Sequence, residues 1–124
     1  LMVEVLPFSA TVPGPDLRAG IAKGVRMAAE FGADFVKTKY TGDAETFRAV
    51  VDSTYVPVVI LGGPKVHSDL ELLTMVHQAL SAGASGVAFG RNIWQHRSPS
   101  KLVRALAAVI HDEALPEQAA RLLD

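Results

Sequence analysis

Strand-like and helical patterns alternate four times along the sequence, and this alternation limits the chain to folds with a parallel sheet. The strand-like segments are short apolar runs, and between them apolar residues recur every three or four positions, as on one face of a helix. Strands joined through helices of this length run parallel, with right-handed crossovers. Apolar residues at nearly every strand position are typical of strands covered on both faces. The predicted strands span residues 1–6, 34–40, 56–61 and 86–89.

The chain has 124 residues, enough for one domain at most, and no linker or charge run divides it. We therefore expect a single α/β unit over the whole chain, residues 1–124. Asp43 and Ser68 are predicted helix N-caps, and residues 9–15 have the proline and glycine content of a loop. Pro116 is expected to end the helix before it, and residues 114–124 to form a C-terminal amphipathic helix.

Four strand–helix units agree with two architectures. They make up half of a (β/α)8 barrel, which has about 250 residues in all, or they form a small open doubly wound sheet. Helices on only one side of the sheet would favour the half-barrel. The chain begins at Leu1, without Met, inside a predicted strand, so we expect a fragment or a processed chain.

Charge and composition exclude several partners. Twelve Lys and Arg against thirteen Asp and Glu give a formal net charge of −1, which offers little electrostatic support for binding duplex nucleic acid. No apolar run approaches the length of a membrane span, so we expect no membrane partner. The absence of cysteine excludes disulfides and cysteine nucleophiles, and it fits a cytoplasmic location. The four histidines lack the spacing of metal ligands on one helix face.

Lys37 lies within a predicted strand, where a charged side chain is unusual because burying an unpaired ammonium is costly. Lys39 follows two residues later and shares its face by strand alternation. Two like charges on one partly desolvated face favour a neutral amine at Lys37, which a Schiff base with a carbonyl compound requires. Alternatively, both lysines reach solvent from the end of the strand or pair with Asp34 and Asp43.

Glu4 lies in the first predicted strand, between two valines. On one strand parity its side chain points to the same side as Lys37, and apolar surroundings there would suit it to general acid or base catalysis. On the other parity it faces the helix layer. A structural ion pair with Lys37 or Lys39 is an equally good interpretation.

Glycine-rich turns follow the third and fourth predicted strands. Gly62 and Gly63 follow the third, and Gly90 and Arg91 follow the fourth. Glycines allow backbone N–H groups to approach an anion closely, and Arg91 adds a charge-assisted contact. A phosphate site built from the last two strand–helix loops recurs in (β/α)8 enzymes. Alternatively, the glycines only meet the geometry of tight turns.

Three segments of the chain resemble class I aldolases of the deoxyribose-phosphate and archaeal-type fructose-bisphosphate aldolase group. Residues 32–43 read GADFVKTKYTGD, residues 56–65 read VPVVILGGPK and residues 82–95 read AGASGVAFGRNIWQ. They are similar to the strand-six, strand-seven and strand-eight segments of that family, in the family's order and spacing. The resemblance covers about residues 20–110 and is highly specific.

The resemblance implies that this chain forms strands five to eight of a (β/α)8 TIM barrel. It also implies cleavage or formation of a C–C bond in a phosphorylated ketose through a Schiff base on Lys37, without a cofactor or a metal. It assigns Gly62, Gly63, Gly90 and Arg91 to the substrate phosphate. Lys39 is then the neighbour that keeps the catalytic amine neutral.

The sequence departs from the family pattern in two places. Archaeal-type fructose-bisphosphate aldolases have a proton-transferring Tyr on strand five before a Pro, where this chain has Leu6 before Pro7. Members acting on tagatose bisphosphate or sulfo-sugars have a strand-five Glu, a pattern that Glu4 resembles, so Glu4 is the acid/base candidate. Strands one to four, with the family's strand-one Asp, are missing from the chain.

A different function is open to a chain of this kind. A half-barrel has two open sheet edges and an uncovered apolar interior, both of which favour association. It could be a catalytically silent phosphate-binding or oligomerising module, or a transferase-like relative of the same family. In each case we expect pairing with a missing N-terminal half or self-association into a homo-oligomer.

Overall fold

A computed structural model describes residues 1–6 and 15–124. The predicted loop over 9–15 lies, apart from Pro15, outside the described residues. Four strands form one parallel sheet, as the alternation of patterns predicted. Their order in the sheet is that of the chain. The strands are β1 (Met2–Val5), β2 (Phe35–Thr38), β3 (Val58–Leu61) and β4 (Gly86–Ala88). The helices are α1 (Pro15–Glu30), α2 (Ala44–Asp52), α3 (Asp69–Ser81), α4 (Arg91–Trp94), α5 (Pro99–His111) and α6 (Pro116–Ala120), followed by the 3-10 turn η1 (Arg121–Leu123).

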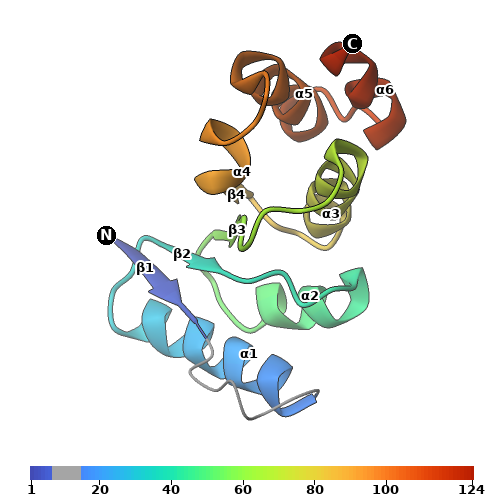
Figure 1. The fold of residues 1–124 in the computed structure, drawn as a ribbon. Coiled ribbons are helices and arrows are strands. Elements are labelled where there is room, and N and C mark those ends of the chain that lie inside the picture. The colour runs from blue at the N-terminus through green and yellow to red at the C-terminus, as the bar shows by residue number, and fades with distance from the viewer. Residues whose placement is uncertain (7–14) are drawn as a thin grey trace.

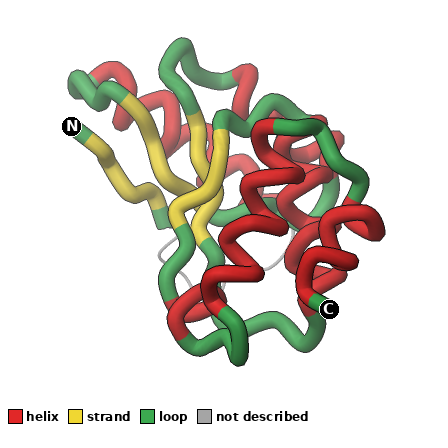
Figure 2. Tube along the Cα trace, turned by 90° about the horizontal axis from the view of Figure 1, so that it is seen from above, coloured by secondary structure: helices red, strands yellow, loops and turns green. Residues whose placement is uncertain are grey.

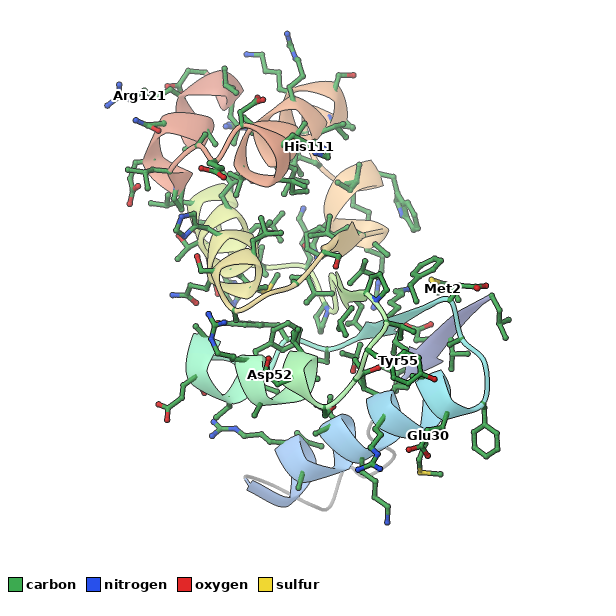
Figure 3. All side chains as sticks on the ribbon, turned by 180° about the vertical axis from the view of Figure 1, so that it is seen from behind. Met2, Glu30, Asp52, Tyr55, His111 and Arg121 are labelled. Atoms are coloured by element: carbon green, nitrogen blue, oxygen red, sulfur yellow. The ribbon has the colours of Figure 1, made fainter. Side chains whose placement is uncertain are left out.

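The helices are gathered on one face of the sheet. In Figure 1, α1, α2, α3 and α5 form an arc around the strands, and Figure 2 shows the four strands side by side with the helices alongside them. Met2 lies on the side of β1 away from Glu30 of α1 (Figure 3) and is 43% exposed. A doubly wound sheet has helices on both faces, so the arrangement in the described residues differs from that alternative.

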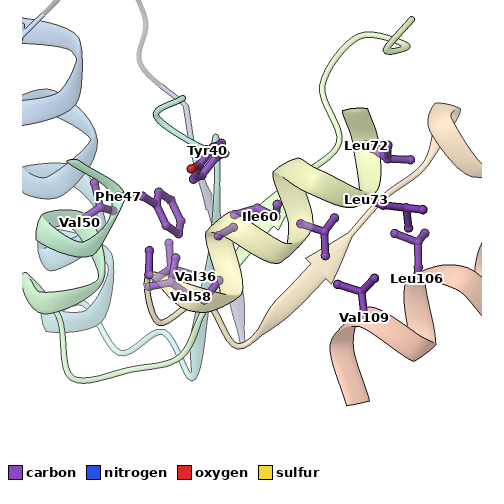
Figure 4. Close-up of a cluster of buried hydrophobic side chains, with 14 of the residues drawn as sticks. Val36, Tyr40, Phe47, Val50, Val58, Ile60, Leu72, Leu73, Leu106 and Val109 are labelled. Atoms are coloured by element: carbon purple, nitrogen blue, oxygen red, sulfur yellow. The ribbon is translucent and has the colours of Figure 1, made fainter. Parts of the chain in front are cut away.

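The core lies between the sheet and this helix layer. Alternate residues of the central strands point into it, as the two-residue period of a strand requires. Phe47 of α2 packs edge-on against Tyr40, with ring centroids 5.2 Å apart, a favourable geometry for two aromatic rings. Figure 4 shows the strand valines between α2 on one side and α3 and α5 on the other. Fully buried members of the core include Val36, Phe47, Val58, Ile60, Leu73, Val76 and Leu102.

Side chains at the helix ends explain where the helices begin and stop. The Asp43 carboxylate accepts a hydrogen bond from the Thr46 backbone N–H at 2.8 Å, and Ser68 Oγ accepts one from the Glu71 N–H at 3.1 Å, so both predicted N-caps are confirmed. Pro116 begins α6, whereas α5 ends at His111, five residues before the proline that was expected to stop it. The segment predicted as one helix over 114–124 forms α6 and then η1.

The observed strands are shorter than the predicted ones, and one helix was not predicted. Pro57 has no N–H to donate, and its carbonyl accepts from the Val36 N–H at 2.9 Å just before β3 begins. The four-residue helix α4 follows Gly90, where the sequence indicated only a turn. No helix in the described part of the chain is long and apolar enough to cross a membrane.

Candidate active site

Glu4 and Lys37 lie side by side on the face of the sheet that the helices leave open. They are register partners in the β1–β2 pair, so their side chains share one face. Lys37 Nζ lies 3.3 Å from Glu4 Oε1, and the two side chains are 20% and 41% exposed. Of the two parities considered for Glu4, the structure has the one that directs it toward Lys37. The two groups also form the ion pair that was the alternative interpretation.

Lys39 directly follows β2 and is exposed. Alternation places Val36 and Thr38 in the core and Lys37 on the opposite side. Lys39 lies beyond the last residue of β2 and lines one pocket beside α1 and another beside the turn after β3. Of the two partners considered for these lysines, Asp43 lies 3.3 Å from Arg18 and Asp34 pairs with the amino group of Leu1. Because the recorded charged partner of Lys37 is a carboxylate, the neutral amine expected from two neighbouring lysines stays a prediction.

The surroundings of Lys37 along the sheet are apolar and uncrowded. Its register partner on β3 is Val59, and the partner of Val59 on β4 is Gly86. A Cβ added to Gly86 would meet no atom within 4 Å. The row Glu4–Lys37–Val59–Gly86 therefore has its two charged groups at one end and open space at the other.

Thr38 holds the strands that carry the ion pair in a fixed relation. It is fully buried on the helix side, and its Oγ1 donates a hydrogen bond to the Val5 carbonyl at 2.8 Å. The hydroxyl is thus satisfied, and it links β2 to β1 one residue beyond the Glu4–Lys37 pair. A buried polar group that is hydrogen-bonded in this way specifies the strand register.

The two glycine-rich turns lie together at the carboxyl end of the sheet. Arg91 Nη2 lies 3.5 Å from the Gly63 carbonyl oxygen. A pocket of about 260 Å³ beside the turn after β3 is lined by Gly62, Gly63 and Lys39 among others. The residues assigned to phosphate binding therefore come together from β3 and β4, and Lys39 lies at the same rim.

Each glycine also has a structural reason to be there. A Cβ on Gly62 would lie 3.0 Å from Asn92 Nδ2, and a Cβ on Gly90 would lie 2.5 Å from the Trp94 ring. Gly63 has a φ of +60°, a conformation that favours glycine. Turn geometry thus accounts for these glycines whether or not they bind an anion.

Sequence reasoning missed Asn92, which connects the two turns. It is 4% exposed, and its Nδ2 donates to the Gly62 carbonyl at 2.8 Å and to the Pro64 carbonyl at 3.3 Å. Its Oδ1 accepts from the Val66 N–H at 3.1 Å. Asn is common in turns, so only the burial of its amide distinguishes Asn92.

His96 joins the same region to the start of α3. Its Nδ1 accepts from the Ser98 N–H at 3.0 Å, which leaves the proton of a neutral ring on Nε2, 3.0 Å from Asp69 Oδ1. Because both ring nitrogens are occupied, His96 is a structural link between α3 and the segment before α5. In the described part of the chain, no group of three His, Asp or Glu side chains could hold a metal ion.

Two pKa values at the rim are shifted. Hydrogen bonds from the Thr46 backbone and hydroxyl lower the pKa of Asp43, and the Arg18 guanidinium lowers it further. Burial raises the pKa of Tyr40, with a smaller contribution from the Asp43 charge. Asp43 is therefore held as the ionised cap of α2.

Comparisons with known proteins agree on one family. The model of the DeoC/LacD family aldolase matches residues 2–96. An uncharacterised aldolase of Saccharolobus solfataricus is 43% identical over 122 residues, which cover 96% of this chain and 45% of that protein. The 2-amino-3,7-dideoxy-D-threo-hept-6-ulosonate synthase of Halobacterium salinarum is 45% identical, with 96% of this chain and 46% of that protein covered.

Solved structures show the same relationship. The chain matches the structure of an archaeal fructose-1,6-bisphosphate aldolase, described as having its catalytic Lys covalently bound to the carbinolamine intermediate of the substrate. The TM-score is 0.80 at 40% identity, with 88% of this chain and 44% of that chain covered. The chain thus spans about half the length of the curated relatives it matches.

Proposed function

The chain belongs to the DeoC/LacD family of aldolases, and from this premise we propose that the full-length protein is a class I aldolase that cleaves or forms a C–C bond in a phosphorylated ketose. The observation that carries the proposal is the pair on the open face of the sheet, with Lys37 Nζ 3.3 Å from Glu4 Oε1. A partly buried lysine beside a carboxylate supplies both the nucleophile and the proton-transfer group of a Schiff-base mechanism.

In the proposed reaction, the Lys37 amine attacks the ketone carbon, and loss of water gives an iminium ion. Glu4 takes the proton from the hydroxyl on the β carbon, and the bond between the α and β carbons breaks. Its electron pair passes into the iminium to form an enamine, and an aldehyde leaves. Protonation of the enamine and hydrolysis then release the second product and free Lys37.

The substrate phosphate is assigned to Gly62, Gly63, Gly90 and Arg91. The 3.5 Å approach of Arg91 to the Gly63 carbonyl supports this assignment, because it brings both turns to one site. Anchoring the phosphate there would hold the carbonyl carbon near Lys37, at the carboxyl end of the same sheet. Lys39 at the rim is assigned to favouring the neutral amine of Lys37.

We further infer that the four strands are strands five to eight of a (β/α)8 barrel. Helices on one face of the sheet support this inference, as does coverage of about half of each relative. The other half of the barrel would cover the open face, and an intact mass near twice 13.2 kDa for the natural protein would agree with it. A homo-oligomeric state and a cytoplasmic location stay predictions.

Borohydride trapping tests the chemistry. Full-length protein incubated with dihydroxyacetone phosphate and borohydride should carry a reduced adduct on Lys37, identified by peptide mass mapping. Lys37→Met should abolish the adduct, whereas the matched variant Lys39→Met should still form it. An adduct on Lys39, or none on the folded wild-type protein, would contradict the proposal.

The alternative of a silent phosphate-binding or oligomerising module predicts phosphate binding without an adduct. A transferase-like activity is the second candidate, and the 45% identity to a Halobacterium salinarum synthase favours it. Both the aldolase and the transferase-like enzyme would form the Lys37 adduct. Product analysis with a second carbonyl substrate would separate them.

A further inference from the structure

Asn92 has its backbone in the short helix α4, which follows β4, and its side chain hydrogen-bonds to the loop after β3. Its Nδ2 donates to the carbonyls of Gly62 and Pro64 at 2.8 and 3.3 Å, and its Oδ1 accepts from the Val66 N–H at 3.1 Å. The residue is 4% exposed, so water does not compete for these bonds. The amide is therefore a buried cross-link between two loops.

The groups around the Asn92 side chain, two carbonyls and one N–H, suit the donor and acceptor of an amide. A carboxylate of the same size could not donate to two carbonyls, and an apolar side chain could make none of the three hydrogen bonds. Gly62 completes the fit, because a Cβ there would lie only 3.0 Å from Asn92 Nδ2 and 3.0 Å from Phe89 Cδ1. Any side chain at position 62 would therefore crowd the Asn92 amide.

The Asn92 hydrogen bonds lie on either side of Gly63, the residue whose carbonyl Arg91 approaches. Asn92 holds the carbonyls of Gly62 and Pro64, the two neighbours of Gly63, and Arg91 Nη2 lies 3.5 Å from the Gly63 carbonyl. Arg91 itself is exposed and directly precedes Asn92. The buried amide therefore fixes the backbone on both sides of Gly63 relative to the arginine.

We propose that Asn92 is the positioning residue of the phosphate site, holding the turn after β3 at the distance from Arg91 at which both turns take the same phosphate group. This inference rests on the proposed function, which assigns the substrate phosphate to these turns. Asn92 acts through Gly62, Pro64 and Val66 and does not itself contact the phosphate.

The test uses Asn92→Leu in the full-length protein, a change that removes three hydrogen bonds and adds no charge. Affinity for inorganic phosphate, measured by calorimetry, is expected to fall by roughly tenfold, since the lost bonds outnumber those of a typical single deletion. Trapping of dihydroxyacetone phosphate on Lys37 should then need a correspondingly higher concentration. Trapping of unphosphorylated dihydroxyacetone should keep the wild-type concentration dependence.

Thr38→Val is the matched control. Thr38 is equally buried and donates one hydrogen bond, but it connects β1 to β2 and not the two turns. It should lower the stability of the protein and leave phosphate affinity within about twofold of wild type, because its hydrogen bond joins β2 to β1 and holds neither turn. If Asn92→Leu does not fold, Asn92→Ser, which is too short to reach both carbonyls, should show a smaller loss of the same kind.

The outcomes separate this inference from the proposed function. Wild-type phosphate affinity in a folded Asn92 variant overturns the role of Asn92, even where the aldolase chemistry is demonstrated. Phosphate binding that needs Asn92, without any adduct on wild-type Lys37, supports the inference and contradicts the aldolase. A wild-type protein that binds no phosphate overturns the role of Asn92 and the assignment of the phosphate to these turns, and the Lys37 adduct then decides the aldolase chemistry by itself.

Discussion

The two faces of the sheet differ in burial and in chemistry. On the helix-covered face, the side chains of the central strands β2 and β3 are at most 1% exposed: Val36, Thr38, Val58 and Ile60. On the open face, Met2 and Phe35 are 43% and 36% exposed, and this face also carries Glu4 and Lys37. Apolar burial on one face specifies the fold, while the other face is left for charged groups that a packed core would exclude.

The largest expected difference between the faces is in stability, and two phenylalanines measure it. Phe47→Ala in the 124-residue chain should lower the free energy of unfolding by about 3–5 kcal/mol, because it removes a fully buried ring. Phe35→Ala, the same change on the open face, should cost about 1 kcal/mol or less. Urea denaturation gives both values.

Equal losses would mean that the open face is as closely packed as the helix-covered one. In a full-length protein whose other half covers this face, the Phe35→Ala loss should rise toward the Phe47→Ala value. Comparing the Phe35→Ala loss in the 124-residue chain with the loss in the full-length protein therefore tests whether the open face is an interior surface.

The second prediction separates chemistry from stability on the open face. Glu4→Gln in the full-length enzyme should lower kcat by about 10²–10⁴, the usual contribution of a positioned acid or base. It should change the free energy of unfolding by about 1 kcal/mol or less, because the pair with Lys37 is partly exposed. Steady-state kinetics and urea denaturation measure the two effects.

Glu45→Gln on the exposed surface of α2 is the control and should affect neither quantity. If Glu4→Gln retains full kcat and loses stability instead, Glu4 is only the ion-pair partner of Lys37. The acid/base group would then have to come from another part of the protein.

The smallest expected effect concerns the helix layer and its dependence on pH. The folded protein lowers the pKa of Asp43 below the unfolded value of about 3.9. Its contribution to stability is therefore complete above that value and is lost as the pH falls through the lower folded pKa. Urea midpoints at pH 5 and pH 3 should fall more for wild type than for Asp43→Asn. Equal falls would show that the cap hydrogen bonds do not depend on the charge.

Much of the fold could be predicted from local patterns. Four strands, their order of alternation with helices and the caps at Asp43 and Ser68 all follow from residues close together in sequence. The parity of Glu4 relative to Lys37 does not, because the register of parallel strands depends on how the helix between them packs. The pairing of β1 with β2 is what places Glu4 and Lys37 on the same face.

The reactive residues of the site could be predicted from the sequence, but the residues that hold its loops in place could not. Lys37 stands out because a charged residue within a buried strand is unusual, and Arg91 because it follows a glycine in the turn after a strand. Asn92 and His96 do not stand out, since their importance comes from partners 26 to 30 residues away in sequence. Asn92 and Gly62 are 30 residues apart in sequence, and only the packing of β3 beside β4 brings them together. No local sequence pattern indicates this contact.

The sheet has the same strand order as the chain, and this has a consequence for how the protein is made. Thr38 and Val5, which hydrogen-bond across β1 and β2, are 33 residues apart, and every other strand pair also joins neighbouring units. Loop closure is therefore divided into similar short steps. Each strand–helix unit can dock on the one before it as it leaves the ribosome, so assembly proceeds in the direction of synthesis.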